Sequence, residues 1–345
     1  TLRLVLDTLG MTFDAVKGFI NEVSGLRSKG GGIKNPTFLE GEELQIAKAR
    51  VVAAWLSDGH VAYYDKVKTG SSTYAEASPG RIKQFKKTLR LFGEVYYNEK
   101  ATSGTDMKTA VFPKIWTDML ISWGLHQGDK TVLNPGIPDF VRNGSDSVKI
   151  AYLEELVCED GSVSTHGGSF KVSIVRASLL RAGSRSKKYG VSSKVSNKHV
   201  KFIIKHGKYS KFLKGRHVSW KKLKDLKNSD DPNDSSIAAE LMILALENRN
   251  RLLDDELDIA GYFGIGMTPF LTSVNYYERT GRVTVSWKAE TNSVEDATRW
   301  GLIATPNDTR KRAIMKKALS VRDDLVSRLK DEISPEWTSS EKAEV

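Results

Sequence analysis

Two short stretches of the sequence repeat one pattern, and this repeat limits the folds that the chain can adopt. They are "VVAAWLSDG" at 51–59 and "LEELVCEDG" at 153–161. Each is an apolar, helix-like run that ends in Asp-Gly, and each is followed by residues typical of strands. These are the only two Asp-Gly dipeptides in the chain, and Asp58 and Asp160 lie 102 residues apart. The pattern predicts two similar structural units.

The acid at the end of each run is unfavourable for a helix. An exposed carboxylate there faces the negative end of the helix dipole, at a cost of about 0.3–1 kcal/mol. The simplest interpretation is a tight turn in which Gly59 supplies a positive φ. A chemical role for Asp58 and Asp160 is the alternative.

In each copy the predicted elements occur in the same order, αββαββα, which begins with the helix that carries the motif. The sequence therefore predicts an α+β fold of two pseudo-symmetric units, 42–148 and 149–336, followed by a tail, 337–345. Residues 1–41 are predicted to form a helical, helix-turn-helix-like segment in which Thr12 caps the second helix. In the second unit, 236–265 is predicted to be one long helix.

The positive charge of the chain is concentrated in one segment. The net charge is +11, but residues 181–227 contain sixteen Lys and Arg against one acid, which leaves −4 for the rest. Aromatic residues are interspersed among these cations, a composition that suits phosphates and stacked bases. We interpret 181–233 as a basic insertion into the second unit. It is predicted to bind nucleic acid through residues that include Lys187, Lys188, Lys198, Lys201 and Lys205, and a solvated loop is the alternative.

Composition excludes several other classes of protein. A single cysteine, Cys158, rules out a disulfide framework and a cysteine-based zinc cluster. No apolar run approaches the roughly 20 residues that span a bilayer, so no membrane partner is expected. We expect a soluble protein of a reducing compartment: cytoplasm, nucleus or organelle matrix. Walker, nucleophile-elbow and HExxH motifs are absent from the sequence.

The two motifs, their spacing and the approach to the second, "WGLHQGDKTVLNPGIPDFVRNGSDSVKIAYLEELVCEDG", resemble the LAGLIDADG homing endonucleases in their double-motif, single-chain form. The resemblance covers about residues 42–336. It implies a monomer whose motif helices pack side by side and whose two antiparallel sheets form a saddle on double-stranded DNA. It also implies site-specific, double-strand, Mg²⁺-dependent cleavage by an intron- or intein-encoded nuclease.

The resemblance assigns roles to particular residues. Asp58 and Asp160 would hold a shared Mg²⁺ (or Mn²⁺), with Gly59 and Glu159 as further candidates for its coordination. The basic residue that the family places near each active centre would be Lys130 and Lys311, each of which follows a Trp-Gly-Leu. The strand candidates for contact with DNA include Tyr63, Lys66, Lys68, Tyr74, Lys171, Arg282 and Lys288, and half of the strand candidates are expected to face the helices instead.

The second motif departs from the family at two positions. Glu155 stands where a small residue is usual, and Cys158 replaces an acid. A carboxylate buried in a tight helix interface requires a partner, so we expect either a cation near Glu155 or a helix turned so that Glu155 meets solvent. The alternative function is therefore a cleavage-inactive nucleic-acid-binding protein of the same fold, an RNA maturase or a regulator, with RNA as a partner.

Overall fold

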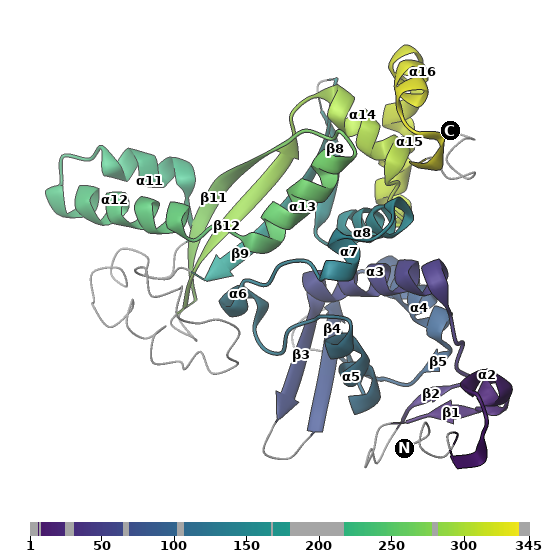
Figure 1. The fold of residues 1–345 in the computed structure, drawn as a ribbon. Coiled ribbons are helices and arrows are strands. Elements are labelled where there is room, and N and C mark those ends of the chain that lie inside the picture. Colours follow the sequence, from purple (N-terminus) through teal and green to yellow (C-terminus); the bar gives the residue numbers. More distant parts are fainter. Residues whose placement is uncertain are drawn as a thin grey trace. The chain divides into compact units, whose positions relative to one another are not determined.

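The computed structural model describes residues 6, 8–24, 31–64, 69–101, 107–166, 168–179, 217–277 and 282–337. The chain forms two compact units, Thr1–Leu125 and His126–Val345, which are described separately (Figure 1). The fold is α+β and its sheets are antiparallel. No helix among the described residues is long and apolar enough to cross a membrane.

The first unit has the predicted order of elements. Four strands form one antiparallel sheet in the order β3-β4-β7-β6, and three longer helices accompany it. The elements are α3 (Gly41–Asp58), β3 (Gly59–Tyr64), β4 (Thr69–Glu76), α4 (Pro79–Leu89), the 3-10 turn Arg90–Phe92, β6 (Asn98–Ala101), β7 (Lys108–Phe112) and α5 (Lys114–Ser122).

An aromatic cluster forms the core of this unit. Trp55 of α3 packs against Phe85 and Phe112 with ring centroids 5.4 and 5.1 Å apart. Tyr74 is buried and stacks on Phe85 at 3.9 Å. Tyr74 is therefore one of the strand candidates that face the core instead of DNA, because its ring is part of the aromatic cluster.

Where the structure describes it, the N-terminal segment is less helical than predicted. Thr12 does cap a helix, since its Oγ1 accepts a hydrogen bond from the Ala15 amide at 3.3 Å. That helix, α2 (Phe13–Val16), has four residues and passes into the 3-10 turn Lys17–Phe19. Gly18 lies in this turn, and glycine disfavours helix by about 0.5–1 kcal/mol relative to alanine. The segment then supplies β1 (Glu22–Val23) and β2 (Ile33–Lys34), which form a small sheet with β5 (Glu94–Val95).

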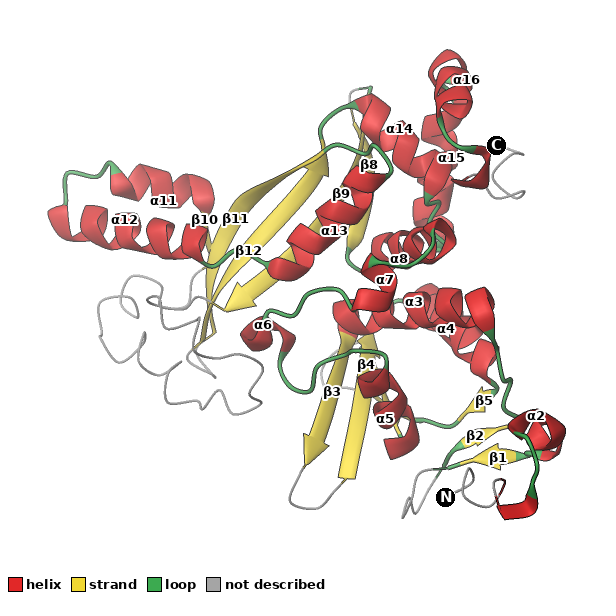
Figure 2. Ribbon diagram, in the orientation of Figure 1, coloured by secondary structure: helices red, strands yellow, loops and turns green. Residues whose placement is uncertain are grey.

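The second unit contains a five-stranded antiparallel sheet in the order β10-β11-β12-β9-β8. Helices α13 and α14 pack on this sheet, and α11 and α12 form a separate helical pair at the end where β10 lies (Figure 2). The elements are α6 (Lys130–Leu133), α7 (Asp139–Arg142), α8 (Asp146–Glu159), β8 (Gly161–His166), β9 (Ser169–Leu179), β10 (His217–Ser219), α11 (Trp220–Lys227), α12 (Pro232–Glu247), α13 (Arg251–Tyr262), β11 (Met267–Tyr277), β12 (Arg282–Thr291), α14 (Val294–Ile303), α15 (Thr309–Ser320), α16 (Asp323–Glu332) and the 3-10 turn Pro335–Trp337.

Two features of this unit differ from the sequence prediction. The long helix predicted over 236–265 is two helices, α12 and α13, because Asn250 starts a new helix by accepting the Leu253 amide on its side chain at 2.8 Å. Residues 126–148, placed by the prediction in the first unit, belong to the second. Asp255 of α13 holds them there through the Ile137 amide, at 2.8 Å, and through an ion pair with Arg142.

The glycine of each Asp-Gly pair is required by close packing. Gly59 has φ −91°, so the positive φ expected at a tight turn is wrong. A Cβ on Gly59 would lie 2.4 Å from Cδ1 and 2.6 Å from Cα of Trp55. A Cβ on Gly161 would lie 2.6 Å from Cα of Val157. In both units the first strand therefore begins directly against the last turn of the motif helix.

Replacing Gly59 with alanine tests this packing. We expect Gly59→Ala to lower the free energy of unfolding by about 1–3 kcal/mol, because the new methyl group overlaps Trp55. Gly80→Ala in α4 is the matched control, since its Cβ would meet only Ser78 Oγ at 3.9 Å, and it should be neutral or slightly stabilising. Chemical denaturation measures both, and equal stability of the two variants would contradict the packing argument.

Candidate functional site

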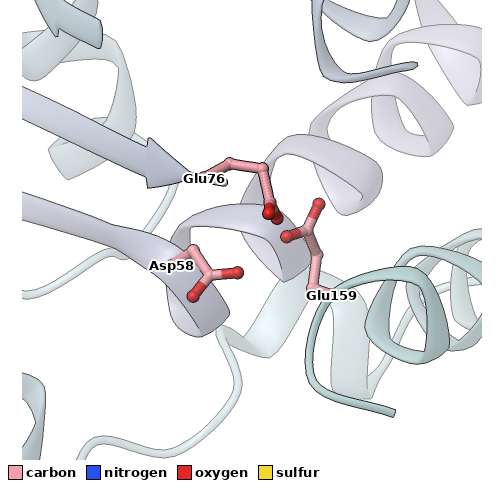
Figure 3. Close-up of side chains that lie close together, drawn as sticks. All are labelled: Asp58, Glu76 and Glu159. Carbon is pink, nitrogen blue, oxygen red and sulfur yellow. The ribbon is translucent and has the colours of Figure 1, made fainter. Parts of the chain in front are cut away.

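The acid of the first motif lies beside a second carboxylate and an arginine. Asp58 is the last residue of α3, Glu76 the last of β4, and Arg81 lies in the first turn of α4. Arg81 Nη2 is 3.0 Å from Asp58 Oδ2, and Arg81 Nε is 2.9 Å from Glu76 Oε2. Carboxylate oxygens of Asp58 and Glu76 lie within 4.8 Å of each other (Figure 3). We call these three residues the Asp58 centre.

The sheet register explains why Glu76 lies there. β3 and β4 pair antiparallel with Gly59 opposite Tyr74, so β4 ends where α3 ends. Glu76 Oε1 also accepts hydrogen bonds from the amides of Ala77 and Ser78, both at 2.7 Å, which fix the carboxylate at the turn into α4. Glu76 is a site residue that was not predicted from the sequence. The available signal was an acid at the end of the strand that pairs beside the motif.

The acid of the second motif lies in a buried network within its own unit. Asp160 follows the last residue of α8 and is ion-paired with Nη1 of Arg176 from β9. The same guanidinium is held by Glu256 of α13 through two hydrogen bonds, from Nε at 3.0 Å and from Nη2 at 2.6 Å. Tyr152 of α8 donates its hydroxyl hydrogen to Glu256 at 3.0 Å. We call these four residues the Asp160 network.

Electrostatics keeps Arg176 charged in this network. Burial alone would lower the pKa of Arg176, but the adjacent Glu256 and Asp160 carboxylates outweigh it and hold the pKa above its ordinary value. Burial raises the pKa of Glu256, and Arg176 opposes that shift. Burial, followed by the Glu256 charge, raises the pKa of Tyr152 well above its ordinary value, so its hydroxyl remains a donor. Asp160 thus faces a permanent cation.

Lys311, a predicted catalytic residue, caps the second motif helix. Its Nζ donates to the carbonyl oxygens of Val157 at 2.8 Å and Cys158 at 2.6 Å, the last-turn carbonyls that a helix leaves unsatisfied. The thiol of Cys158 accepts from the amides of Asn307 and Asp308, at 3.0 and 3.2 Å. Burial raises the pKa of this thiol, so it remains protonated.

The other candidates near the motifs occupy distinct places. Lys130 begins the short helix α6, whose N-cap is Asp129. Glu159 is buried at the last position of α8 (Figure 3). Glu155 is only 1% exposed, so the alternative in which α8 turns Glu155 toward solvent is wrong.

Few of the predicted DNA contacts fall on side chains that the structure describes. Lys171 of β9 is exposed and 3.4 Å from Glu290, and Lys288 of β12 is 2.5 Å from the same carboxylate. The hydrogen bond from Lys288 lowers the pKa of Glu290 by more than partial burial raises it. Lys171 makes a smaller contribution in the same direction. Tyr63 and Arg282 lie on β3 and β12, but their side chains are outside the described set. Also outside the described residues are Lys66, Lys68, Lys187, Lys188, Lys198, Lys201 and Lys205.

The described end of the basic insertion is an exposed cationic helix. Leu223 anchors α11 in the protein, and Ser219 caps it by accepting the Lys222 amide at 3.2 Å. Its four lysines are all exposed: Lys221, Lys222, Lys224 and Lys227. The sequence analysis assigned these residues to the insertion without predicting the helix.

No family model and no curated protein matches the sequence. Solved structures are similar to it. A mesophilic variant of the homing endonuclease I-DmoI is 11% identical with a TM-score of 0.40, over 80% of this chain and 100% of that one. The LAGLIDADG meganuclease I-AabMI bound to uncleaved DNA is 8% identical with a TM-score of 0.34, over 84% and 94% of the two chains. DUF199/WhiA from Thermatoga maritima is 8% identical with a TM-score of 0.33, over 85% and 62%.

Two of these structures are a homing endonuclease and a LAGLIDADG meganuclease. Identities of 8–11% transfer no activity. What the protein does therefore depends on the chemistry of its own residues.

Removal of the Lys311 ammonium tests its role as a cap of the second motif helix. We expect Lys311→Met to lower the free energy of unfolding by about 1.5–3 kcal/mol, because two carbonyls lose charge-assisted hydrogen bonds. Lys316→Met on the exposed face of the same helix is the control and should change stability by less than about 0.5 kcal/mol. Thermal and urea denaturation measure the difference. If Lys311→Met were as stable as Lys316→Met, the capping role would be excluded.

Proposed function

We propose that the protein is a metal-dependent DNA endonuclease of the homing type, with Asp58 and Asp160 as the acids of its two centres. The observation that carries the proposal is a duplicated arrangement. In each unit the motif acid meets an arginine from a neighbouring element, and that arginine also contacts a glutamate: Glu76 in one unit, Glu256 in the other. A structural turn alone would not require this arrangement twice.

The residues of the Asp58 centre fit a divalent cation. Asp58 and Glu76 offer hard oxygen ligands, and neither histidine nor cysteine belongs to the centre, which suits Mg²⁺ or Mn²⁺ better than zinc. Such an ion would activate water and stabilise the leaving oxygen in phosphodiester hydrolysis. A single ion shared by Asp58 and Asp160, as the family resemblance implies, remains a prediction.

The protein's own groups would perform the remaining tasks. Glu76, held by two backbone amides, keeps its carboxylate beside Asp58. The partly exposed Arg81 supplies positive charge where a phosphate would approach. We propose that the two sheets together bind double-stranded DNA, that α11 contacts phosphates through its exposed lysines, and that the chain acts as a monomer.

A second candidate is a nucleic-acid-binding protein that does not cleave. The observation in its favour is the buried Arg176, which already neutralises Asp160. Such a protein would retain the cationic surface and bind DNA or RNA, with the motif acids serving only as partners of arginine.

Substitution of both motif acids distinguishes the two candidates. The assay is selection of cleaved plasmids from a library with randomised inserts, with Mg²⁺. We expect the wild-type chain to cleave and the double variant Asp58→Asn/Asp160→Asn to lose at least about 10³-fold in rate. Duplex affinity, measured by fluorescence anisotropy, should be unchanged or tighter, because the substitutions remove negative charge that would face phosphates.

The control is Asp118→Asn in α5, a surface acid paired with Lys114 at 2.5 Å, which should cleave at the wild-type rate. A double variant that cleaves as fast as wild type would refute the assignment of Asp58 and Asp160. Wild-type protein that binds tightly but cleaves nothing in Mg²⁺ or Mn²⁺ would establish the second candidate.

A further inference from the structure

The two arginines that face the motif acids are held very differently. Arg81 lies in the first turn of α4, its side chain is 17% exposed, and its partner Asp58 is 33% exposed. Arg176 lies on β9 between β12 and β8 in the sheet, and its side chain is 5% exposed. Arg81 is thus partly exposed, whereas Arg176 is part of the interior, although the two acids differ little, since Asp160 is 27% exposed.

Arg176 is also held in place by Glu256, a partner that water could not solvate if Arg176 moved away. Glu256 is fully buried and accepts hydrogen bonds from both Nε and Nη2 of the Arg176 guanidinium. Withdrawal of Arg176 would leave the Glu256 carboxylate in the interior with only Tyr152 as a donor from this network. A buried charge that loses its partner is strongly destabilising. By contrast, Glu76 keeps two backbone amide donors if Arg81 moves away.

From this difference we infer that Arg176 is a resident cation of the second motif. Its Nη1 is ion-paired with Oδ2 of Asp160, the carboxylate that would have to supply a metal ligand, and this pairing keeps the Asp160 carboxylate from acting as a ligand in the native chain. Glu256 and Tyr152 are positioning residues that keep the guanidinium in this place. The Asp58 centre, whose arginine is partly exposed, remains the one that can admit an ion, in place of the single ion shared by Asp58 and Asp160 that the family resemblance implies.

The inference predicts unequal chemistry at the two motifs. Resting on the proposed function, it implies that the two DNA strands are cut at different rates and that a nicked product precedes the linear one. The occupancy of Asp160 by Arg176 does not depend on cleavage, however, and metal binding tests it directly.

The experiment is titration of the full chain with Mn²⁺, with free ion measured by electron paramagnetic resonance. We expect Asp58→Asn to weaken Mn²⁺ binding at least tenfold and Asp160→Asn to change it less than twofold. In an Asp58→Asn background, the pair Arg176→Met/Glu256→Gln should gain an Mn²⁺ site, because Asp160 is released. This gain should disappear when Asp160→Asn is added.

The pair is changed together because Arg176→Met alone would leave a buried carboxylate without its cation, and Gln at 256 can still accept from Tyr152. Circular dichroism and melting temperature verify that the variants fold. Arg176→Lys retains a cation and should not gain the site. If the Arg176–Glu256 pair were purely structural, no variant at positions 176 and 256 would change the number of bound Mn²⁺ ions.

Two results would overturn the inference: a tenfold loss of Mn²⁺ affinity in Asp160→Asn, or a folded Arg176→Met/Glu256→Gln chain that gains no ion. Both results can be measured even if the protein cleaves no DNA. The failure of this inference can therefore be distinguished from the failure of the proposed function.

Discussion

The structure around both motifs depends on the neutralisation of a carboxylate at the C-terminal end of a helix. Asp58 and Asp160 each lie where the helix dipole is negative and where the chain turns directly into a strand. Close packing of Gly59 on Trp55, and of Gly161 on Val157, fixes that turn. A cation must therefore be supplied from elsewhere in the fold, and in each unit an arginine supplies it.

The source of that arginine gives the two units different chemistry. In the first unit it comes from a helix start at the surface, beside a glutamate that has its own backbone donors. In the second it comes from an interior strand and is tied to a glutamate with no exposure. Lys311 adds a further cation at the carbonyls of α8. The second motif is thus the more heavily neutralised, and the first is the more accessible to an ion.

The sequence predicted the features that depend on neighbouring residues. The helical runs ending at Asp58 and next to Asp160, the strand pairs that follow and the Thr12 cap are local patterns, and the structure has them. The break between α12 and α13 falls in a polar stretch, residues 247–251, and the Asn250 cap within it was the signal that the prediction of one long helix left out.

The partners of the motif acids could not be found in the same way. Arg176 and Glu256 lie on β9 and α13 and reach Asp160 only through the packing of those elements. Glu76 reaches Asp58 only through the register of β3 and β4. Lys311 was instead predicted from a parallel between two short segments, and its ammonium lies on the carbonyls of α8.

The unequal roles of the two motifs can be tested most directly by locating the ion. Crystals grown with Mn²⁺ and analysed by anomalous scattering would show every bound ion and its ligands. The account predicts a peak within coordination distance of Asp58 and Glu76, about 2.0–2.2 Å from oxygen as for ions of this type, and an Asp160 carboxylate still paired with Arg176. An Mn²⁺ peak coordinated by Asp160, with Arg176 turned away from it, would contradict the account.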